Sequence, residues 1–359
     1  MTDILSLLRL SKTRRASDLH LVVGAPPMAR IDGALEVLDG HGSLTSDDVN
    51  AAFKIMATPA QQNEFATNLE LDFGMALDDV GRLRCNAARQ RGDISFAIRL
   101  LPAEVPTVEG LNLPDVYKDL AMRQHGLVIA SGPTGSGKTT SLATMINHIN
   151  HNRACHVVTI EDPIEYTHSN VKSAITQRQL GTDTLSFATA LKHVLRQDPD
   201  VILVGEMRDV ETAQAAITVA ETGHLVLTTG HATGAPEAID RVIGLFPPEQ
   251  RYLAQMRIAA TLVAVLGQTL VPRTGGTGRI AAVEIMLGNS AVKNLIRDGK
   301  IHQLHNVIRT NTRSGMTTMD QSLARLYVQG IIDADTLVEF CHNKDEVEEI
   351  AGIRLSRRG

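Results

Sequence analysis

One short segment combines glycines, a lysine and threonines at a spacing that suits phosphate binding. The sequence GPTGSGKTT matches the pattern G-x-x-x-x-G-K-[ST]. Glycines let successive backbone amides turn toward phosphate oxygens, the lysine reaches the terminal phosphates, and the hydroxyl that follows it can ligate Mg²⁺. We expect a nucleoside triphosphate to bind here, with Thr139 on the metal and with contacts from Gly132, Pro133, Thr134, Gly135, Ser136, Gly137, Lys138, Thr139 and Thr140.

Glu206 is a candidate for activating the water that attacks the terminal phosphate. It follows the apolar run 201–204 and Gly205, so a buried strand is expected to deliver its carboxylate to the phosphate end of the sheet. A carboxylate there can accept a proton from the water or orient it for in-line attack. The alternative is a structural acid that caps a helix or pairs with Arg208.

Three carboxylates stand close together in the segment TIEDPIE, at the end of another apolar run. Glu161, Asp162 and Glu165 fall within five residues of one another. Such a density of acids indicates a network that holds a metal ion or water. The alternative is an acidic turn exposed to solvent.

Two histidines and two arginines are further candidates. His224 and His231 flank the run 225–228, so we expect them at opposite ends of one strand, where one imidazole can contact the terminal phosphate or a neighbouring subunit. Arg84 and Arg99 lie on expected strands of the N-terminal region, and a role in catalysis requires that they act on another subunit's nucleotide. The alternatives are structural histidines and surface ion pairs.

These candidates require an α/β domain to position them. Short apolar runs alternate with helical segments, a pattern typical of a largely parallel sheet covered on both faces, at 127–130, 156–160, 201–204 and 225–228. The phosphate-binding segment therefore has the strand–loop–helix context that its motif needs.

The chain divides into four regions by sequence texture. Residues 1–100 are expected to form a small α+β domain, because helical stretches interrupt strand-like runs at 19–23, 82–86 and 94–100. Several prolines predict a linker over 101–118. The α/β domain is expected over 119–285, and a helical region over 286–359.

Composition limits the class of protein and of partner. Of the 359 residues, 43% are hydrophobic and 21% are charged, which is typical of a globular protein, and the net charge of −5 argues against a nucleic-acid partner. The three cysteines include no CxxC pair, as in proteins of a reducing compartment. The N-terminus does not read as a signal peptide, and the stretch 258–271 is too short to span a membrane. We expect a cytoplasmic protein without a transmembrane segment.

Taken together, these motifs resemble the secretion-superfamily ATPases of type II secretion and type IV pili, and most closely the PilT-like retraction ATPases. The similarity spans nearly the whole chain and is carried by ASDLHL, PPMARIDG, GRLRCNAARQ, AIRLLP, GPTGSGKTT, TIEDPIEY and LRQDPDVILVGEMRDVETAQAAITVAETGHLV. The segment AVKNLIRDGKIHQL is similar to a signature of retraction motors, and the paired cysteines of the assembly and type II secretion ATPases are missing. Two positions depart from the family pattern, with Gly230 in place of Leu and Lys293 in place of Arg.

The resemblance implies a PAS-like N-terminal domain, a RecA-like P-loop ATPase core and a helical C-terminal part. It also implies a role for each candidate. Glu206 would be the catalytic glutamate, and Glu161, Asp162 and Glu165 would form the Mg²⁺ and water network, with the metal at Asp162. His224 and His231 would be the box histidines, and Arg84 and Arg99 would be the trans-acting arginines. The implied assembly is a homohexamer at the cytoplasmic face of the inner membrane. It would use ATP to act on a pilus platform protein there, and a paralogous retraction ATPase is a further partner that the resemblance implies.

Three alternatives stay open on sequence grounds. The first is an ATPase of the same superfamily that drives pilus assembly, type II secretion or conjugation. The second is a regulatory or scaffold subunit that binds ATP without hydrolysing it. The third, a small-molecule kinase, would need a lid and an acceptor site, and the sequence has no signature of either.

Overall fold

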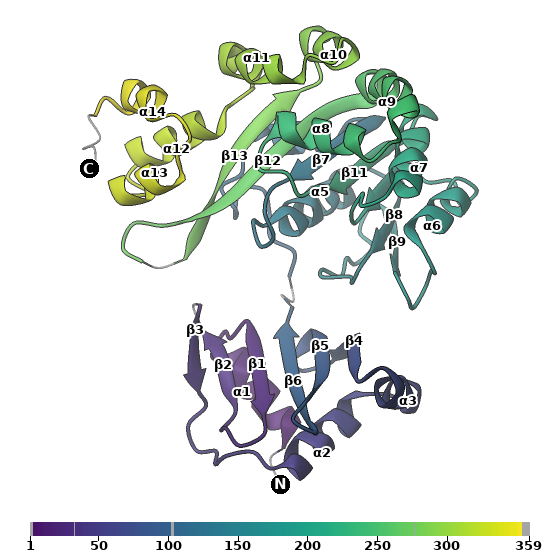
Figure 1. The fold of residues 1–359 in the computed structure, drawn as a ribbon, viewed down its shortest axis with the longest axis vertical. Coiled ribbons are helices and arrows are strands. Elements are labelled where there is room, and N and C mark those ends of the chain that lie inside the picture. The colour runs from purple at the N-terminus through teal and green to yellow at the C-terminus, as the bar shows by residue number, and fades with distance from the viewer. Residues whose placement is uncertain (1–2, 32, 102–103, 277, 354–359) are drawn as a thin grey trace. The chain divides into compact units, whose positions relative to one another are not determined.

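The computed structural model describes residues 3–31, 33–101, 104–276 and 278–353. By internal contacts the chain divides into two compact units, many of whose elements are labelled in Figure 1. The first unit contains Met1–Glu104 together with the short segment Pro163–Thr167. The second contains Val105–Asp162 and His168–Gly359.

The first unit is an antiparallel sheet with helices packed on it. Its elements are α1 (Ile4–Thr13), β1 (Asp18–Val22), β2 (Met28–Ile31), β3 (Ala34–Val37), α2 (Ser46–Met56), α3 (Pro59–Asn68), β4 (Glu70–Leu77), β5 (Gly81–Gln90) and β6 (Asp93–Leu100). The strands lie in the order β3-β2-β1-β6-β5-β4, and all neighbours are antiparallel. The predicted α+β fold of this region is confirmed.

Local sequence explains where α2 and α3 begin. The hydroxyls of Thr45 and Thr58 each accept a hydrogen bond from the N–H of the third helical residue, Asp48 or Gln61. The side chain of that residue in turn accepts a hydrogen bond from the threonine N–H. Such reciprocal caps satisfy donors that the first helical turn leaves without acceptors. Apolar side chains of both helices and of the sheet then form one core.

The second unit is built on a mixed sheet. Its strands are β7 (Gly126–Ser131), β8 (His156–Glu161), β9 (Ala174–Gln179), β10 (Val201–Val204), β11 (Leu225–Thr229), β12 (Leu262–Pro272) and β13 (Arg279–Leu287). They lie in the order β13-β12-β7-β11-β10-β8-β9, with β13 antiparallel to its neighbour and the other pairs parallel. The four apolar runs predicted as parallel strands correspond to β7, β8, β10 and β11.

Helices connect these strands and continue to the C-terminal part of the chain. They are α4 (Val116–Ala121), α5 (Lys138–Asn152), α6 (Phe187–Val194), α7 (Val210–Glu221), α8 (Ala235–Gly244), α9 (Pro248–Thr261), α10 (Ser290–Arg297), η1 (Ile301–Gln303), α11 (Leu304–Thr310), η2 (Thr312–Ser314), α12 (Met319–Val328), α13 (Ala334–Phe340) and α14 (Lys344–Ala351). The predicted helical character of the C-terminal part is confirmed.

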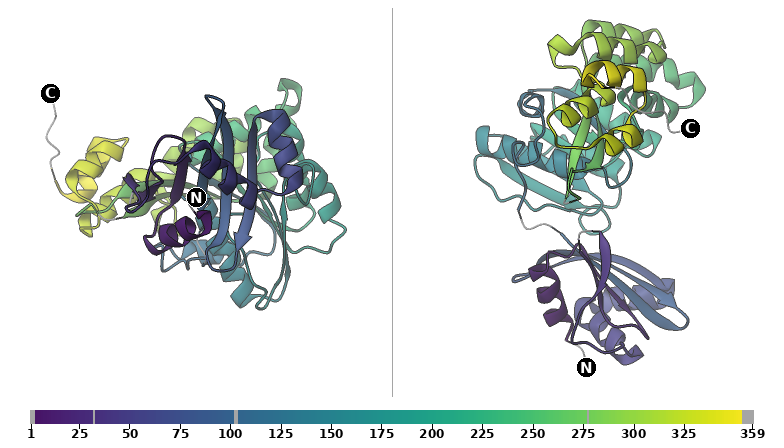
Figure 2. Two further views of the ribbon diagram at one scale, coloured as in Figure 1. Left: turned by 90° about the horizontal axis from the view of Figure 1, so that it is seen from below. Right: turned by 90° about the vertical axis from the view of Figure 1, so that its left-hand side faces the viewer.

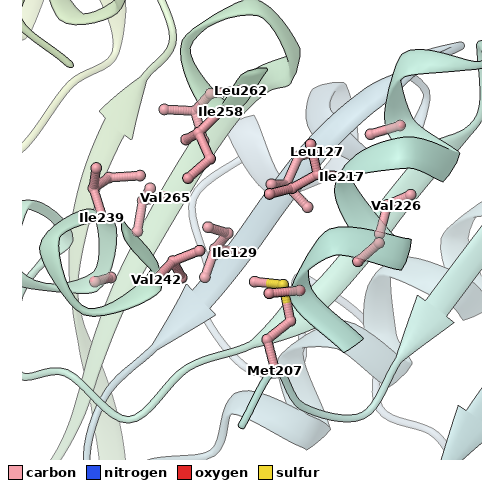
Figure 3. Packing of buried hydrophobic residues seen from close by; sticks show 14 of the residues in the cluster. Leu127, Ile129, Met207, Ile217, Val226, Ile239, Val242, Ile258, Leu262 and Val265 are labelled. Atoms are coloured by element: carbon pink, nitrogen blue, oxygen red, sulfur yellow. The ribbon is translucent and has the colours of Figure 1, made fainter. Parts of the chain in front are cut away.

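Both faces of the second sheet are covered by helices. On one face, Leu127 and Ile129 of β7 lie in a cluster with Ile217 of α7 (Figure 3). On the other face, Val128 of the same strand packs in a cluster with Met145 of α5. Successive strand side chains point to opposite faces, so a strand covered on both sides must be apolar throughout. This explains the continuous apolar runs.

The C-terminal helices α12 and α13 pack beside the hairpin of β12 and β13 (Figures 1 and 2). Leu323 and Leu337 from these helices share a buried cluster with Val271 and Ile280 from the hairpin. The stretch 258–271 is divided between the end of α9 and most of β12. Over the described parts of the chain, every helix is too short or too polar to cross a bilayer.

Candidate nucleotide-binding site

The predicted phosphate loop follows β7 and leads into α5. Gly132, Gly135 and Gly137 have φ angles of +148°, +78° and +87°, a region that favours glycine. A Cβ atom on Gly132 would lie 2.2 Å from the backbone oxygen of Gln268 on β12. The loop therefore needs glycine both for its turns and for its close approach to the neighbouring strand.

The start of α5 fits an anion. Gly137 precedes the helix and supplies no side-chain cap. The first N–H groups of an α-helix have no acceptor within the helix, and the helix dipole adds positive charge at this end. The Ser136 hydroxyl is buried without a hydrogen-bond partner among the described residues. This donor set suits the phosphates of a nucleotide.

Lys138 is held against the loop that it serves. Its Nζ donates to the carbonyl oxygens of Gly132 and Pro133, both at 2.8 Å, and the residue is buried. A phosphate oxygen carries more negative charge than a carbonyl oxygen and makes a stronger bond with an ammonium group. A bound phosphate can therefore replace these two carbonyls.

The parallel register brings several candidates to the edge where this loop lies. Val204 of β10 pairs with Ile160 of β8 and Thr228 of β11, and Thr229 pairs with Ala130 of β7. The residues that end or follow these strands therefore share one edge of the sheet, which we call the carboxyl edge. They are Glu161, Glu206 and His231, together with the phosphate loop.

Glu206 is held by two side chains at this edge. Its Oε1 accepts a hydrogen bond from Nε of Arg208 and lies 3.1 Å from Nε2 of His231. The Glu206 side chain is only 17% exposed, whereas that of Arg208 is 72% exposed. The hydrogen bond with Glu206 raises the pKa of Arg208 despite the opposing effect of burial, and the charges of Glu206 and Asp162 raise it further. The pairing with Arg208 that sequence offered as an alternative is present.

Two further contacts fix the chain around Glu206. The Thr229 hydroxyl donates to the carbonyl of Gly205. The Ser131 hydroxyl donates to the Ala232 carbonyl at 2.8 Å and accepts from the Ala232 N–H at 3.1 Å. A pocket of about 380 Å³ opens beside these residues, lined by Glu206, Arg208, His231 and Arg241 among others. The edge thus presents a carboxylate with fixed partners next to open space.

The three clustered acids are placed differently from one another. Glu161 is buried and accepts hydrogen bonds from the Thr159 hydroxyl at 2.6 Å and the Gln177 amide at 3.2 Å. Asp162 is exposed at the end of the same segment. Glu165 lies in the segment Pro163–Thr167, which groups with the first unit. Only Glu161 and Asp162 therefore belong to the carboxyl edge of the second unit.

Mg²⁺ fits this edge as a metal carried with phosphates. In the described ranges, no three His, Cys, Asp or Glu side chains gather to hold a metal by themselves. Mg²⁺ in nucleotide sites takes one or two protein ligands and completes its shell with phosphate oxygens and water. The Thr139 hydroxyl in the first turn of α5 and the exposed Asp162 carboxylate are ligands of the right kind.

His224 lies at the opposite edge of the sheet, as the sequence predicted for one of the two histidines. Its carbonyl accepts the N–H of Gly126 at the start of β7, and its Nδ1 lies 3.1 Å from the Val219 carbonyl. The whole length of β11 separates it from His231. The structure therefore does not bring His224 together with the phosphate loop, and the structural alternative describes it better.

Arg84 and Arg99 face each other on β5 and β6 of the first unit. Arg99 donates from Nε to Asp18 at 2.8 Å, and its side chain is 60% exposed. Burial would raise the pKa of Asp18, but hydrogen bonds from Ser17 and Arg99 outweigh it and lower the pKa. The surface ion pair that sequence offered as an alternative is thus present for Arg99, while Arg84 is half-buried.

Sequence reasoning missed several polar residues that hold the site. Ser131, Thr229 and Gln268 are buried, and Gln177 is half-buried. Each bonds a candidate residue or the backbone beside one. For Ser131, Thr229 and Gln268 the signal is a polar side chain inside or at the end of a mostly apolar strand, whereas Gln177 lies on the polar strand β9 and has no such signal. As a whole, the edge can bind phosphates and place a carboxylate beside them, which hydrolysis requires.

Comparisons with known proteins agree with this geometry. A family model described as type II/IV secretion system protein matches residues 111–339. The chain is 42% identical over 337 residues to the type IV pilus retractation ATPase PilT of Pseudomonas aeruginosa, covering 94% of this chain and 97% of that protein. It is 40% identical over 326 residues to the type IV pilus ATPase PilU of the same organism, covering 91% and 85%. The crystal structure of the pilus retraction motor PilT with bound ADP has a TM-score of 0.89 and 40% identity, covering 97% of this chain and 100% of that one.

Proposed function

The chain belongs to the type II/IV secretion system protein family, as its motifs predicted, and from this membership we propose that it is an ATP-hydrolysing motor that retracts a type IV pilus. The likeness to PilT over nearly the full length of both chains supports the choice of system. The observation that carries the enzymatic part is the meeting, at one sheet edge, of the phosphate loop and Glu206 with its fixed partners.

The proposed reaction assigns a role to each group at the carboxyl edge. The loop amides and Lys138 bind the phosphates of ATP. Thr139 and Asp162 would hold Mg²⁺, which would neutralise charge on the phosphates. Glu206 orients the attacking water and accepts its proton, while Nε2 of His231 keeps the carboxylate in place.

The motor requires several copies of the chain. We propose a homohexamer in which Arg84 and Arg99 act on the nucleotide of a neighbouring subunit, and in which Glu161 holds water near the metal. Hydrolysis would change the angle between the two units about the linker 101–118, and the ring would act on an inner-membrane platform protein from the cytoplasm. No nucleic-acid partner is proposed.

Hydrolysis is tested by the release of phosphate from ATP with no added acceptor. We expect turnover by the wild type and an ADP dissociation constant about 10- to 100-fold higher for Lys138→Ala, because a charged hydrogen bond to phosphate is lost. A wild type that binds ATP without turnover would instead be a regulatory subunit. Phosphate transfer that requires an acceptor would identify a kinase.

Retraction is tested in the source organism. We expect deletion of the gene to leave cells with excess surface pili and without pilus-dependent movement. Cells without pili, or with blocked secretion, would place the protein among the assembly or export ATPases and leave the ATP chemistry untouched.

The similar degree of likeness to the type IV pilus ATPase PilU leaves room for another role in the same pilus, and we propose as a second candidate an ATPase that works beside a main retraction motor. The two candidates separate by complementation. If Glu206→Gln restores movement to the deletion strain, another ATPase supplies the turnover, and the chain is the accessory paralogue. If it does not, the chain is itself the motor.

A further inference from the structure

We propose that Gln268 is a positioning residue for nucleotide binding, because its side-chain amide fixes the peptide between Ser136 and Gly137 so that the Gly137 N–H faces the phosphates. The proposal rests on the proposed nucleotide site, and it adds to that site a residue outside the phosphate loop and far from it in sequence.

The strand β12 brings Gln268 beneath the loop. Gly267 pairs with Ser131, the last residue of β7, so Gln268 lies level with Gly132 where the loop begins. A Cβ atom on Gly132 would lie 2.2 Å from the Gln268 backbone oxygen, and one on Gly137 would lie 2.8 Å from its Nε2. Both glycines of the motif therefore leave room for Gln268.

The amide of Gln268 makes two hydrogen bonds of different kinds. Its Nε2 donates to the Ser136 carbonyl at 2.8 Å, and its Oε1 accepts from the Ser141 hydroxyl at 2.8 Å. Gln268 is 3% exposed and Ser141 is 1% exposed, so water does not compete with either bond. The side chain thus joins the loop to the first turn of α5 across the residues expected to bind phosphate and Mg²⁺.

Because of peptide geometry, the hydrogen bond from Gln268 to the Ser136 carbonyl also sets the direction of the Gly137 N–H. In a trans peptide the carbonyl and the following N–H point in opposite directions. The carbonyl of Ser136 points to Gln268, on the β12 side of the loop. The N–H of Gly137 must therefore point away from β12, toward the inside of the loop. Without Gln268, this peptide, which has a glycine on its C-terminal side, loses the bond that fixes its orientation.

The two bonds also explain why the residue is a glutamine. A hydrophobic side chain of similar size would leave the Ser136 carbonyl and the Ser141 hydroxyl buried without partners, which is costly. A glutamate could accept from Ser141 but would place negative charge against the Ser136 carbonyl. Only a side chain that donates at one position and accepts at the other satisfies both neighbours.

The test compares the full-length Gln268→Leu and Gln268→Glu variants with a matched control, Gln321→Leu. Gln321 in α12 is also buried, accepts from the Thr318 N–H at 3.2 Å and donates to the Arg309 carbonyl at 3.4 Å. We expect both Gln268 variants to raise the dissociation constant for ADP about tenfold or more. The control should lower the melting temperature and leave ADP affinity unchanged.

Steady-state kinetics supply a readout that loss of stability alone would not give. In the Gln268 variants the KM for ATP should rise by a factor similar to that for ADP affinity, with kcat changed less than about threefold. A folded Gln268→Leu with wild-type affinity for ADP would overturn the proposal. So would an equal loss of affinity in Gln321→Leu.

Ser141→Ala keeps the experiment decisive if the Gln268 variants do not fold. It removes only the bond that anchors Oε1, and we expect ADP affinity to fall about threefold; unchanged affinity would contradict the proposal. ADP binding does not depend on turnover. A wild type that binds ADP but does not hydrolyse ATP would therefore end the motor proposal and leave the role of Gln268 open to test.

Discussion

The two edges of the sheet in the second unit carry similar residues with different partners. At the amino edge, the Asp200 carboxylate accepts the N–H of His156 at 2.9 Å, and the Nδ1 of His224 lies 3.1 Å from the Val219 carbonyl. At the carboxyl edge, Glu206 contacts the side chains of Arg208 and His231. An acid or imidazole that bonds backbone groups secures the start of a strand, whereas Glu206, held by side chains beside a phosphate loop, is available for chemistry.

The largest expected effect contrasts the carboxylates of the two edges. Glu206→Gln should lower kcat by about 10²–10⁴-fold and leave ADP affinity near that of the wild type, because it removes the proton acceptor. Asp200→Asn makes the same change of group at the amino edge, where the carboxylate also lies 3.4 Å from Arg153. It should change kcat less than about twofold. Phosphate release and ADP titration measure both, and full turnover in Glu206→Gln would refute its assignment.

The second contrast uses two glycines at the ends of β7. In Gly132→Ala the new methyl group would meet the Gln268 backbone, and we expect ADP affinity to fall about 100-fold together with some stability. A Cβ atom on Gly126 would lie 2.4 Å from Val263 Cγ2, and Gly126 has a φ of +113°. Gly126→Ala should therefore lower the free energy of unfolding by about 1–3 kcal/mol. Its ADP affinity in the folded fraction should stay unchanged, and a parallel loss in both variants would break the comparison.

The third contrast is between the histidines. His231→Ala should lower kcat about tenfold or more, because a hydrogen bond to a charged group is worth about 1.5–3 kcal/mol. His224→Ala removes only a contact with backbone and a neighbouring hydroxyl, so kcat should change less than about twofold. Equal losses of kcat would mean that the amino edge also takes part in the reaction, through a neighbouring subunit.

The smallest expected effect concerns Glu284, a carboxylate at the carboxyl edge that has a structural role. Glu284 on β13 pairs with Gly267 and accepts the Ala235 N–H at the start of α8. Burial raises the pKa of Glu284 above its ordinary value of 4.5, and the nearby charge of Glu237 adds to the rise; the Ala235 N–H and His305 oppose it. Because its pKa is raised in the folded state, the contribution of Glu284 to the free energy of unfolding is most favourable below about pH 4.5 and is lost as the pH rises through its folded-state pKa.

Glu284→Gln should remove this loss, because the amide keeps the acceptor for Ala235 and carries no charge. We expect the variant to exceed the wild type in free energy of unfolding by on the order of 1 kcal/mol at pH 8, and the two to converge near pH 4. Denaturant titrations across this range provide the measurement. A difference that does not depend on pH would show that titration of Glu284 is not its cause.

The strands, the phosphate loop and the direction of Glu206 were predictable because their signals are local. An apolar run followed by a polar residue tells both that a strand is buried and where it ends. The apolar run between His224 and His231 likewise predicted that the two histidines lie at opposite ends of one strand, which is β11. These predictions needed no knowledge of distant partners.

The supports of the site were not predictable from such signals. Gln268 meets Ser136 across 132 residues of sequence, and Ser131 meets Ala232 across 101. Only the order of strands β12, β7 and β11 brings these pairs together. The grouping of Glu165 with the first unit was also hidden, because its neighbours in sequence belong to the second.

The position of Lys138 has a consequence for discrimination among ligands. Its ammonium group donates to two carbonyl oxygens of the loop, so it is neither free in solvent nor short of hydrogen bonds. The free energy that a ligand gains from Lys138 is the difference between the bonds its own oxygens make with the ammonium group and the bonds made by the carbonyl oxygens of Gly132 and Pro133. A neutral molecule of the right shape offers nothing better than the loop provides, whereas a polyphosphate offers full negative charge. The loop therefore selects polyphosphates over neutral ligands because its own carbonyl oxygens already bond the lysine.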